Sequence, residues 1–163
     1  MKFLKLLSLL IFLFSCRGEN IDDIRKIDQI LKIYVKNSAE VDLLNKSNTG
    51  SFYSVELKDL SALRDRVSVT STLRTDDSGT KYLEYIAGAT RVLQPNSTET
   101  KKNYKSDIAV QFKATTSADI VEDRMQIFYD DTSAAFQISS VTYNNVVIFT
   151  KVEGQPNIIT IVK

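Results

Sequence analysis

The single cysteine is the residue whose type and position define a chemistry most narrowly. Cys16 follows Leu13-Phe14-Ser15 directly. The stretch Phe3–Phe14 is apolar apart from Lys5 and Ser8, and a second lysine precedes it. A positive start, an apolar middle and a small residue at the end are the parts of a secretory signal.

Residues Met1–Cys16 resemble a bacterial lipoprotein signal peptide with its lipobox. That pattern has an aliphatic residue three positions before the cysteine and Gly, Ala or Ser directly before it, as Leu13 and Ser15 provide. The resemblance implies that residues 1–15 are removed, that the Cys16 thiol carries diacylglycerol, and that residues 16–20 form a lipidated tether.

Three other interpretations of this segment compete with the lipoprotein signal. A membrane-spanning helix needs ~20 apolar residues, and the run is shorter than that. An ordinary secretory signal favours an Ala-x-Ala-like cleavage site, which is absent here. The third is a buried core helix, for which two early lysines are unusual. The lipoprotein signal is the preferred interpretation.

Missing residue types exclude several classes of enzyme. The sequence holds no histidine, no tryptophan and no second cysteine. Ser-His-Asp and Cys-His nucleophilic sites, histidine acid–base catalysis and the common zinc sites are therefore excluded. We expect no catalytic residue, no cofactor and no metal. Disulfides are excluded too, so stability must come from an apolar core.

Net charge gives no reason to expect a nucleic-acid partner. The sequence has 21 Lys+Arg and 20 Asp+Glu, and removal of residues 1–15 takes away two lysines, which leaves a net charge of −1. Binding to nucleic acid requires a clustered basic face. The only local basic cluster, Lys101–Lys105, is interpreted as a solvated loop rather than a phosphate or lipid-headgroup patch.

Acidic and aromatic residues supply the remaining candidates. Acidic pairs could seed a calcium site or a carboxylate dyad, but none has EF-hand spacing, and each is interpreted as a helix cap or turn. The pairs are Asp22-Asp23, Asp76-Asp77, Glu122-Asp123 and Asp130-Asp131. Carboxylates brought together by folding, as in a glycosidase, stay open as an alternative. Tyr104, Tyr129 and Tyr143 could line a pocket or fill the core.

The elements that would position these residues begin with a predicted helix over Ile21–Val35. Its apolar residues recur every three or four positions, and Asn20 is a suitable N-cap. A second short helix is predicted over Ala39–Asn45. The first helix is expected to pack on a sheet through residues of one face. These are Ile24, Ile27, Leu31 and Tyr34, against Val69, Val110, Phe112 and Ile127.

Strand patterns follow the helices, among them Val67–Leu73, Lys81–Leu93 and Ala135–Tyr143. Turns are predicted at Asp76-Asp77-Ser78-Gly79 and at Asn144-Asn145. Six to eight strands joined mostly by short turns indicate an antiparallel meander. The fold class is therefore α+β, one domain over residues 21–163 with the helix on a curved sheet. This outline is similar in shape to cystatin-like and NTF2-like proteins. A β-sandwich with an appended helix is the alternative.

Together these features predict a lipid-anchored protein of the bacterial cell envelope. We expect a non-catalytic binding, assembly or protective module that acts through an envelope protein partner. The alternatives are a carrier of a small or hydrophobic ligand in the sheet concavity and a carboxylate-dependent hydrolase. Arg17, directly after Cys16, favours the outer over the inner membrane by the enterobacterial sorting pattern.

Overall fold

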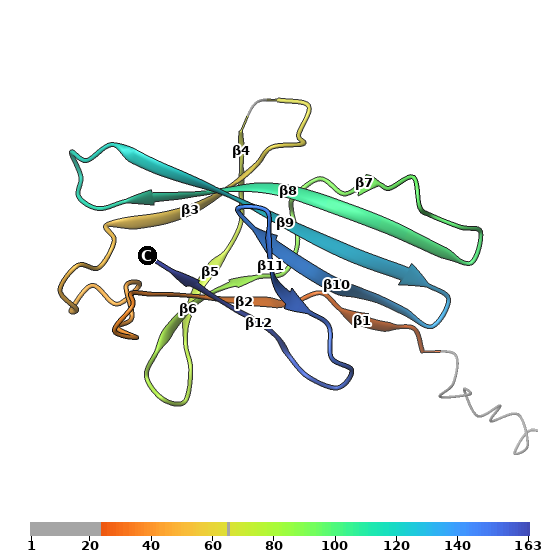
Figure 1. Ribbon diagram of the computed structural model, residues 1–163, viewed down its shortest axis with the longest axis horizontal. Helices are drawn as coiled ribbons and strands as arrows, with labels where there is room; N and C mark the ends of the chain where they lie inside the picture. The colour runs from red at the N-terminus through yellow and green to blue at the C-terminus, as the bar shows by residue number, and fades with distance from the viewer. Residues whose placement is uncertain (1–23, 65) are drawn as a thin grey trace, which may run out of the picture.

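The computed structural model describes residues 24–64 and 66–163, and in these residues the chain is all-β (Figure 1). None of the described residues forms a helix able to span a membrane. The strands are β1 (Lys26–Asp28), β2 (Leu31–Lys36), β3 (Ser54–Asp59), β4 (Val67–Val69), β5 (Thr72–Thr75), β6 (Lys81–Tyr85), β7 (Val92–Leu93), β8 (Lys101–Lys113), β9 (Ile120–Thr132), β10 (Ala135–Tyr143), β11 (Val146–Thr150) and β12 (Asn157–Val162).

These strands form two sheets. The larger has the order β1-β10-β9-β8-β3-β4, with β11 also pairing with β10 and β7 with β8. The smaller has the order β12-β2-β6-β5. Most neighbours are antiparallel, but β1 runs parallel to β10 and β12 runs parallel to β2. The sheets are thus mixed, and the predicted antiparallel meander describes only part of the topology.

One apolar core joins the two sheets. Alternate residues of β2, in the smaller sheet, are fully buried in the same cluster as alternate residues of β8 and β9 in the larger. Among them are Leu31, Ile33, Val35, Ile108, Val110, Met125 and Ile127. Because side chains alternate along a strand, β2 and β9 present their other face to the outside, whereas Asp107 and Ala109 on the other face of β8 are also buried.

The prediction of a helix over Ile21–Val35 is wrong for the described residues, which form β1 and β2 instead. Ile24 is 74% exposed and Ile27 is 60% exposed, whereas alternate residues of β2 are fully buried. The isoleucines repeat at helical spacing, but Leu31–Lys36 also alternates with a period of two. Its β-branched residues pack well on a pleated surface between β12 and β6, and this tertiary pairing decides the conformation.

The second predicted helix, Ala39–Asn45, is also wrong, because polar side chains bind the backbone there and form turns. Asp42 Oδ1 accepts a hydrogen bond from Leu44 N at 2.9 Å, and its Oδ2 accepts one from Lys81 N at 2.8 Å. Asn37 Oδ1 accepts one from Ala39 N at 2.9 Å. Such bonds compete with helical pairing. Both predicted fold classes included a helix, so the α+β assignment and its sandwich alternative are corrected to all-β.

Part of the expected core packing is nevertheless observed. Leu31 lies in the buried cluster with the four sheet residues expected to contact the helix. Tyr34 points to the outer face instead, where its ring packs on Tyr82 with the centroids 5.4 Å apart. The strand Val67–Leu73 breaks in two, so that β4 belongs to the larger sheet and β5 to the smaller.

Turn signals in the sequence are confirmed. Asn144 and Asn145, between β10 and β11, have φ values of 48° and 67°, as a tight hairpin turn requires. Gly79 (φ 84°) closes the turn between β5 and β6. In that turn Asp76 accepts hydrogen bonds from Ser78 N and Thr80 N, both at 2.9 Å, and from Tyr34 Oη at 2.9 Å.

Replacement of Ile33 by Ala should show whether this segment forms strand β2 or the helix predicted from the sequence. Ile33 is fully buried in β2, whereas it lies off the apolar stripe of the predicted helix. We expect Ile33→Ala to lower the free energy of unfolding by about 2 to 5 kcal/mol in urea titrations. The matched control Ile24→Ala, at an exposed position, should leave it nearly unchanged. Equal effects, or a larger effect at Ile24, would contradict the strand.

The turn at Asp76 should make stability depend on acid pH. Hydrogen bonds, first that from the Ser78 hydroxyl, lower the pKa of Asp76 from 3.8 to about 2. Because the folded pKa is the lower one, the carboxylate stabilises the fold above pH 3.8, and this effect is lost as the pH falls towards about 2. The stability difference between the wild type and Asp76→Asn should shrink across that window in thermal melts. Asp77→Asn, which removes the neighbouring charge, is the control; a difference for Asp76→Asn that is constant with pH would refute the assignment.

Candidate binding site

The interior between the sheets is filled by side chains. Tyr85, Tyr129 and Phe112 are the largest of its fully buried residues, and aliphatic side chains occupy the space around them. The hydroxyls of Tyr85 and Tyr129 lie 3.4 Å apart, and burial raises the pKa of Tyr85. This filled core argues against a ligand cavity between the sheets.

Carboxyl groups on the larger sheet are held ionised by neighbouring donors. Arg124 binds both oxygens of Asp107 and, by these hydrogen bonds, lowers the pKa of that carboxyl. A hydrogen bond from Gln111, 2.9 Å long, likewise lowers the pKa of Glu122. A general acid needs a raised pKa. These carboxylates therefore have the properties of structural groups.

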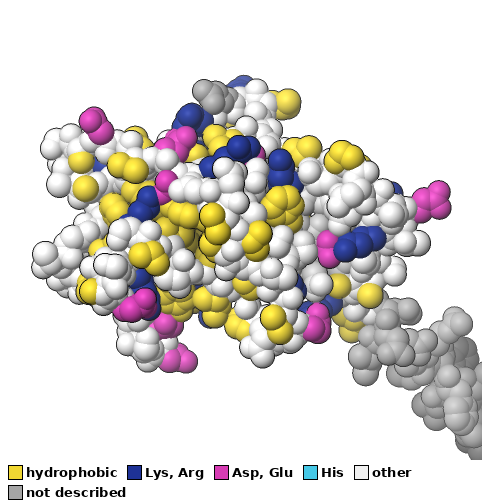
Figure 2. Space-filling view, in the orientation of Figure 1, with side chains coloured by type: hydrophobic (Ala, Val, Ile, Leu, Met, Phe, Trp, Pro, Cys, Tyr) yellow, Lys and Arg dark blue, Asp and Glu magenta, His cyan; other side chains and the backbone are white. Residues whose placement is uncertain are grey.

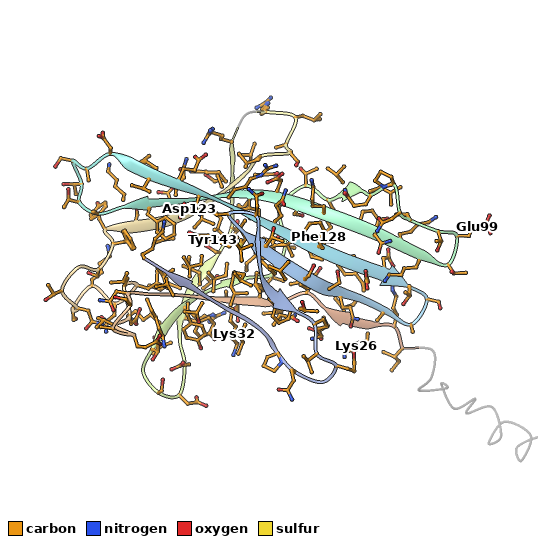
Figure 3. The ribbon with its side chains drawn as sticks, in the orientation of Figure 1. Lys26, Lys32, Glu99, Asp123, Phe128 and Tyr143 are labelled. Atoms are coloured by element: carbon orange, nitrogen blue, oxygen red, sulfur yellow. The ribbon has the colours of Figure 1, made fainter. Side chains whose placement is uncertain are left out.

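Asp123, in β9, belongs to a third such cluster, in which its carboxylate binds Lys163 directly after β12. Burial acts to raise its pKa, but hydrogen bonds from Lys163, Tyr143 and Asn144 outweigh burial and lower it. Figure 3 shows Asp123 and Tyr143 next to each other at the middle of the molecule. Burial and this bond raise the pKa of Tyr143.

The predicted roles of the acidic pairs are only partly right. Asp76-Asp77 lies in a turn, as expected. Glu122-Asp123 and Asp130-Asp131 lie within β9, so their neighbouring carboxylates point to opposite faces of the sheet. Asp22-Asp23 lies outside the described residues. No group of three or more potential ligands in the described part of the chain could hold a metal ion.

The basic cluster Lys101–Lys105 is not a loop, because it forms the start of β8. Its side chains alternate between the two faces. Lys101 lies on the outer face, where it pairs with Asp130 at 2.8 Å. Lys102 and Tyr104 lie on the inner face, opposite Asp131 and Tyr129 of β9. The strand thus separates the lysines that the sequence presents together.

A pocket of about 390 Å³ is lined by residues in or next to β1, β7, β8, β9 and β10. Figure 1 shows β1 and β7 towards the same end of the molecule. There the long strands β8, β9 and β10 extend beyond the strands of the smaller sheet, so that part of the inner face of the larger sheet has no opposing sheet (Figure 1). We call this the arginine pocket. Its lining consists of Arg25, Ile27, Gln29, Arg91, Tyr104, Asp131 and Phe136.

Arg91 has unusual surroundings in this pocket. Its guanidinium lies over two rings, 4.9 Å from the centroid of Tyr129 and 4.6 Å from that of Phe136. One terminal nitrogen, Nη2, donates a 2.6 Å hydrogen bond to Gln29 Oε1. The buried Nε has no acceptor among the described residues. The two rings and the bond to Gln29 fix the orientation of this guanidinium.

The pocket also carries excess positive charge. Its lining has two arginines and one aspartate. Arg25 pairs with Asp131, so the carboxylate is already engaged. No ion pair joins Arg91 to a carboxylate within residues 24–64 and 66–163. Lys102, the cross-strand partner of Asp131, adds a third cation on the same face.

A buried polar cluster holds β1, one wall of the pocket, in place. The ammonium of Lys151, whose side chain is 6% exposed, binds Asp28 Oδ2 at 2.7 Å. It also binds Asn157 Oδ1 at 2.9 Å. The Asn157 amide in turn donates to Asp28 Oδ1 and to the carbonyl of Ile30, at 2.9 and 3.0 Å. We call these residues the Lys151 cluster; it ties β1 and the start of β2 to the β11–β12 connection.

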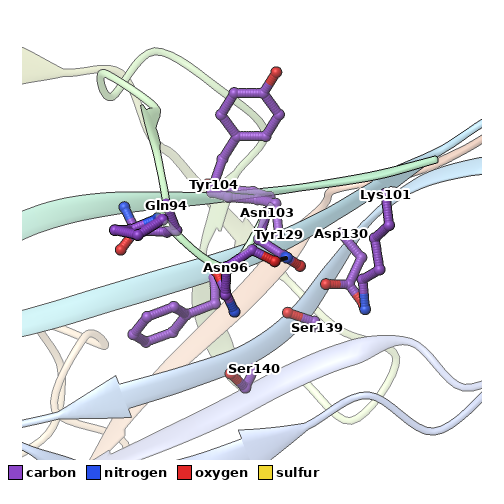
Figure 4. A pocket seen from close by; sticks show the side chains of 11 residues that line it. Gln94, Asn96, Lys101, Asn103, Tyr104, Tyr129, Asp130, Ser139 and Ser140 are labelled. Atoms are coloured by element: carbon purple, nitrogen blue, oxygen red, sulfur yellow. Dashed lines mark hydrogen bonds and ion pairs between the residues drawn. The ribbon is translucent and has the colours of Figure 1, made fainter. Parts of the chain in front are cut away.

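A second, larger groove of about 620 Å³ lies where the loop before β8 faces β9 and β10 (Figure 4). Its lining is mainly polar and includes Gln94, Asn96, Asn103, Ser139 and Ser140. An irregularity in β10 between Ile138 and Ser140 shifts the strand register here. The Lys101–Asp130 pair occupies one end of the groove.

The structure brings together some of the residues singled out in the sequence. Tyr104 and Tyr129 are cross-strand partners at the arginine pocket, whereas Tyr143 lies apart beside Asp123. Cys16, the predicted lipid attachment residue, lies outside the described residues. Sequence reasoning missed Arg91, which follows Gly88 in a stretch predicted to be strand.

Comparison with known proteins gives no family for this chain. No protein-family model, curated protein or solved structure matches it.

The Lys151 cluster should control the stability of the pocket wall. Lys151→Met removes the nearest cation of the largely buried Asp28 carboxylate and leaves only Lys26, 3.7 Å away, so we expect a loss of about 3 kcal/mol in the free energy of unfolding. Lys101→Met, which removes an exposed lysine paired with Asp130 on the larger sheet, is the matched control and should have a much smaller effect. Urea denaturation measures both. Similar effects of the two variants would contradict the role of this cluster.

Proposed function

We propose that this protein is a lipid-anchored, non-catalytic binding module of the bacterial cell envelope that acts through a partner protein. The observation that carries the proposal is the position of the arginine pocket. It is an uncovered, charged concavity in a domain whose interior is filled, and its wall begins at Arg25, close behind the expected tether.

The short distance from Cys16 to Arg25 supports this arrangement. The connection is nine residues long and spans at most about 30 Å when fully extended. A diacylglycerol group on Cys16 keeps the pocket that close to a membrane. Tethering of this kind raises the effective concentration of a module for partners in or on the same membrane.

The two alternative functions receive less support. A carrier that encloses a hydrophobic ligand between the sheets needs space that the core side chains occupy. A hydrolase with two carboxylates needs one with a raised pKa, whereas the pKa values of Asp107, Glu122 and Asp123 are lowered. A binding surface requires neither of these features.

Surface charge is consistent with a protein partner. Figure 2 shows Lys and Arg side chains interspersed with Asp and Glu on the face in view, with hydrophobic side chains exposed between them. Mixed charge with apolar residues is usual at protein–protein contacts. Nucleic acid would be favoured by a continuous basic face.

Substitution of Cys16 tests the anchor and the partner in one experiment. In crosslinked envelopes we expect the wild type to fractionate with the outer membrane, at its processed mass, joined to a defined protein. Cys16→Ala should abolish lipidation, keep the precursor mass and lose the crosslinked partner, while Ser8→Ala serves as a control within the signal segment. A Cys16→Ala chain that is processed and anchored like the wild type would refute the lipoprotein assignment. A wild type that remains uncrosslinked would refute the binding function.

A further inference from the structure

We infer that the arginine pocket binds an oxyanion and that Arg91 is the main residue that contacts it. The oxyanion is a carboxylate or phosphate group attached to an apolar body. This inference deepens the proposed binding function and rests on it, but it does not depend on lipidation of Cys16.

The first argument is the state of the Arg91 guanidinium. Two aromatic rings and Gln29 hold its plane fixed, so little side-chain freedom remains to be lost on binding. Its Nε is buried and has no acceptor among the described residues. Because Nε has almost no accessible surface, an oxyanion in the pocket would bind the terminal nitrogens of the guanidinium, whose donors match carboxylate and phosphate oxygens.

Charge balance gives the second argument. Arg25 and Asp131 neutralise each other, which leaves Arg91 as the uncompensated charge of the pocket lining. Lys102 stands opposite Asp131 on the same face of the sheet, within the usual reach of a cross-strand pair. Arg25, Arg91 and Lys102 together outweigh the single charge of Asp131, so this face of the sheet has a net positive charge that favours an anion in the pocket.

The walls of the pocket indicate the rest of the ligand. Ile27 is 60% exposed, and Tyr104 and Phe136 complete an apolar surface beside the arginines. The volume of about 390 Å³ exceeds what one phosphate or carboxylate group fills. The anionic group therefore has an attached apolar or aromatic body. A soluble metabolite or a lipid headgroup could present the same oxyanion, and the probes below distinguish them.

The side-chain Nε–H resonance of Arg91 is the most direct probe. The mature chain with Cys16→Ala, which carries no lipid, would be titrated with phenyl phosphate and with benzoate, and Arg91→Lys would assign the signal. We expect saturable shifts of this resonance with at least one probe, and weaker binding when salt is raised. Sedimentation with phosphatidylcholine vesicles, with and without phosphatidylglycerol, tests the lipid source.

Matched variants test whether Arg91 is the residue that binds the oxyanion. Arg91→Gln should weaken binding at least tenfold. Lys102→Gln leaves the stacked arginine intact and should weaken binding several-fold, which keeps the test valid if Arg91→Gln unfolds. Arg74→Gln removes an arginine that pairs with Glu84 on the smaller sheet, and it should bind like the wild type. Thermal melts of each variant check folding.

Each outcome bears on the inference. Arg91-dependent binding of phenyl phosphate or benzoate supports it with a soluble ligand, and Arg91-dependent binding of anionic vesicles alone supports it with a lipid headgroup. No binding of any probe, or equal binding by Arg91→Gln and Lys102→Gln, overturns it. If the protein is anchored and crosslinked but its pocket binds no probe, only this inference is overturned. If the chain is not anchored but binds phenyl phosphate, only the proposed function is overturned.

Discussion

The crossing of the chain from one sheet to the other, held by the Lys151 cluster, is the constraint on which the remaining structure depends. β1 pairs with β10 in the larger sheet, and three residues later β2 pairs with β12 and β6 in the smaller one. Asn157 binds Asp28 before the crossing and Ile30 within it. Lys151 supplies the positive charge that allows the Asp28 carboxylate to lie there. This polar cluster fixes where the smaller sheet begins and therefore where the core ends.

The position of that crossing explains why a filled domain has an open end. The inner face of the larger sheet continues past the point at which β2 begins, so its last inward residues have no opposing sheet. Arg91 covers them instead. Its guanidinium lies on Tyr129, which belongs to the core, and on Phe136, which lines the pocket. Because core packing holds both rings, the arginine is preorganised, a state that reduces the entropy cost of binding.

The features that could be predicted from the sequence are local. The Asn144-Asn145 turn, the Asp76–Gly79 turn and the strand Ala135–Tyr143 follow from residue preferences within a few positions. The helix over Ile21–Val35 could not be rejected in this way, because its isoleucines fit helical spacing. Only pairing with β6 and with β12, which lie far away in the sequence, selects the strand. Arg91 is harder still, since its contacts come from Gln29, Tyr129 and Phe136. No spacing in the sequence links these positions.

The most direct test of the central claim, that the open end of the domain is the surface that binds, is site-specific photocrosslinking in intact cells. A photoreactive residue would replace Ile27, at the rim of the pocket, or Val162, at the far end of β12, where both side chains are about 60% exposed. The account predicts a defined adduct from position 27 that is absent from position 162 and disappears with Arg91→Gln. An adduct from position 162 alone, or one from position 27 that is indifferent to Arg91→Gln, would contradict it.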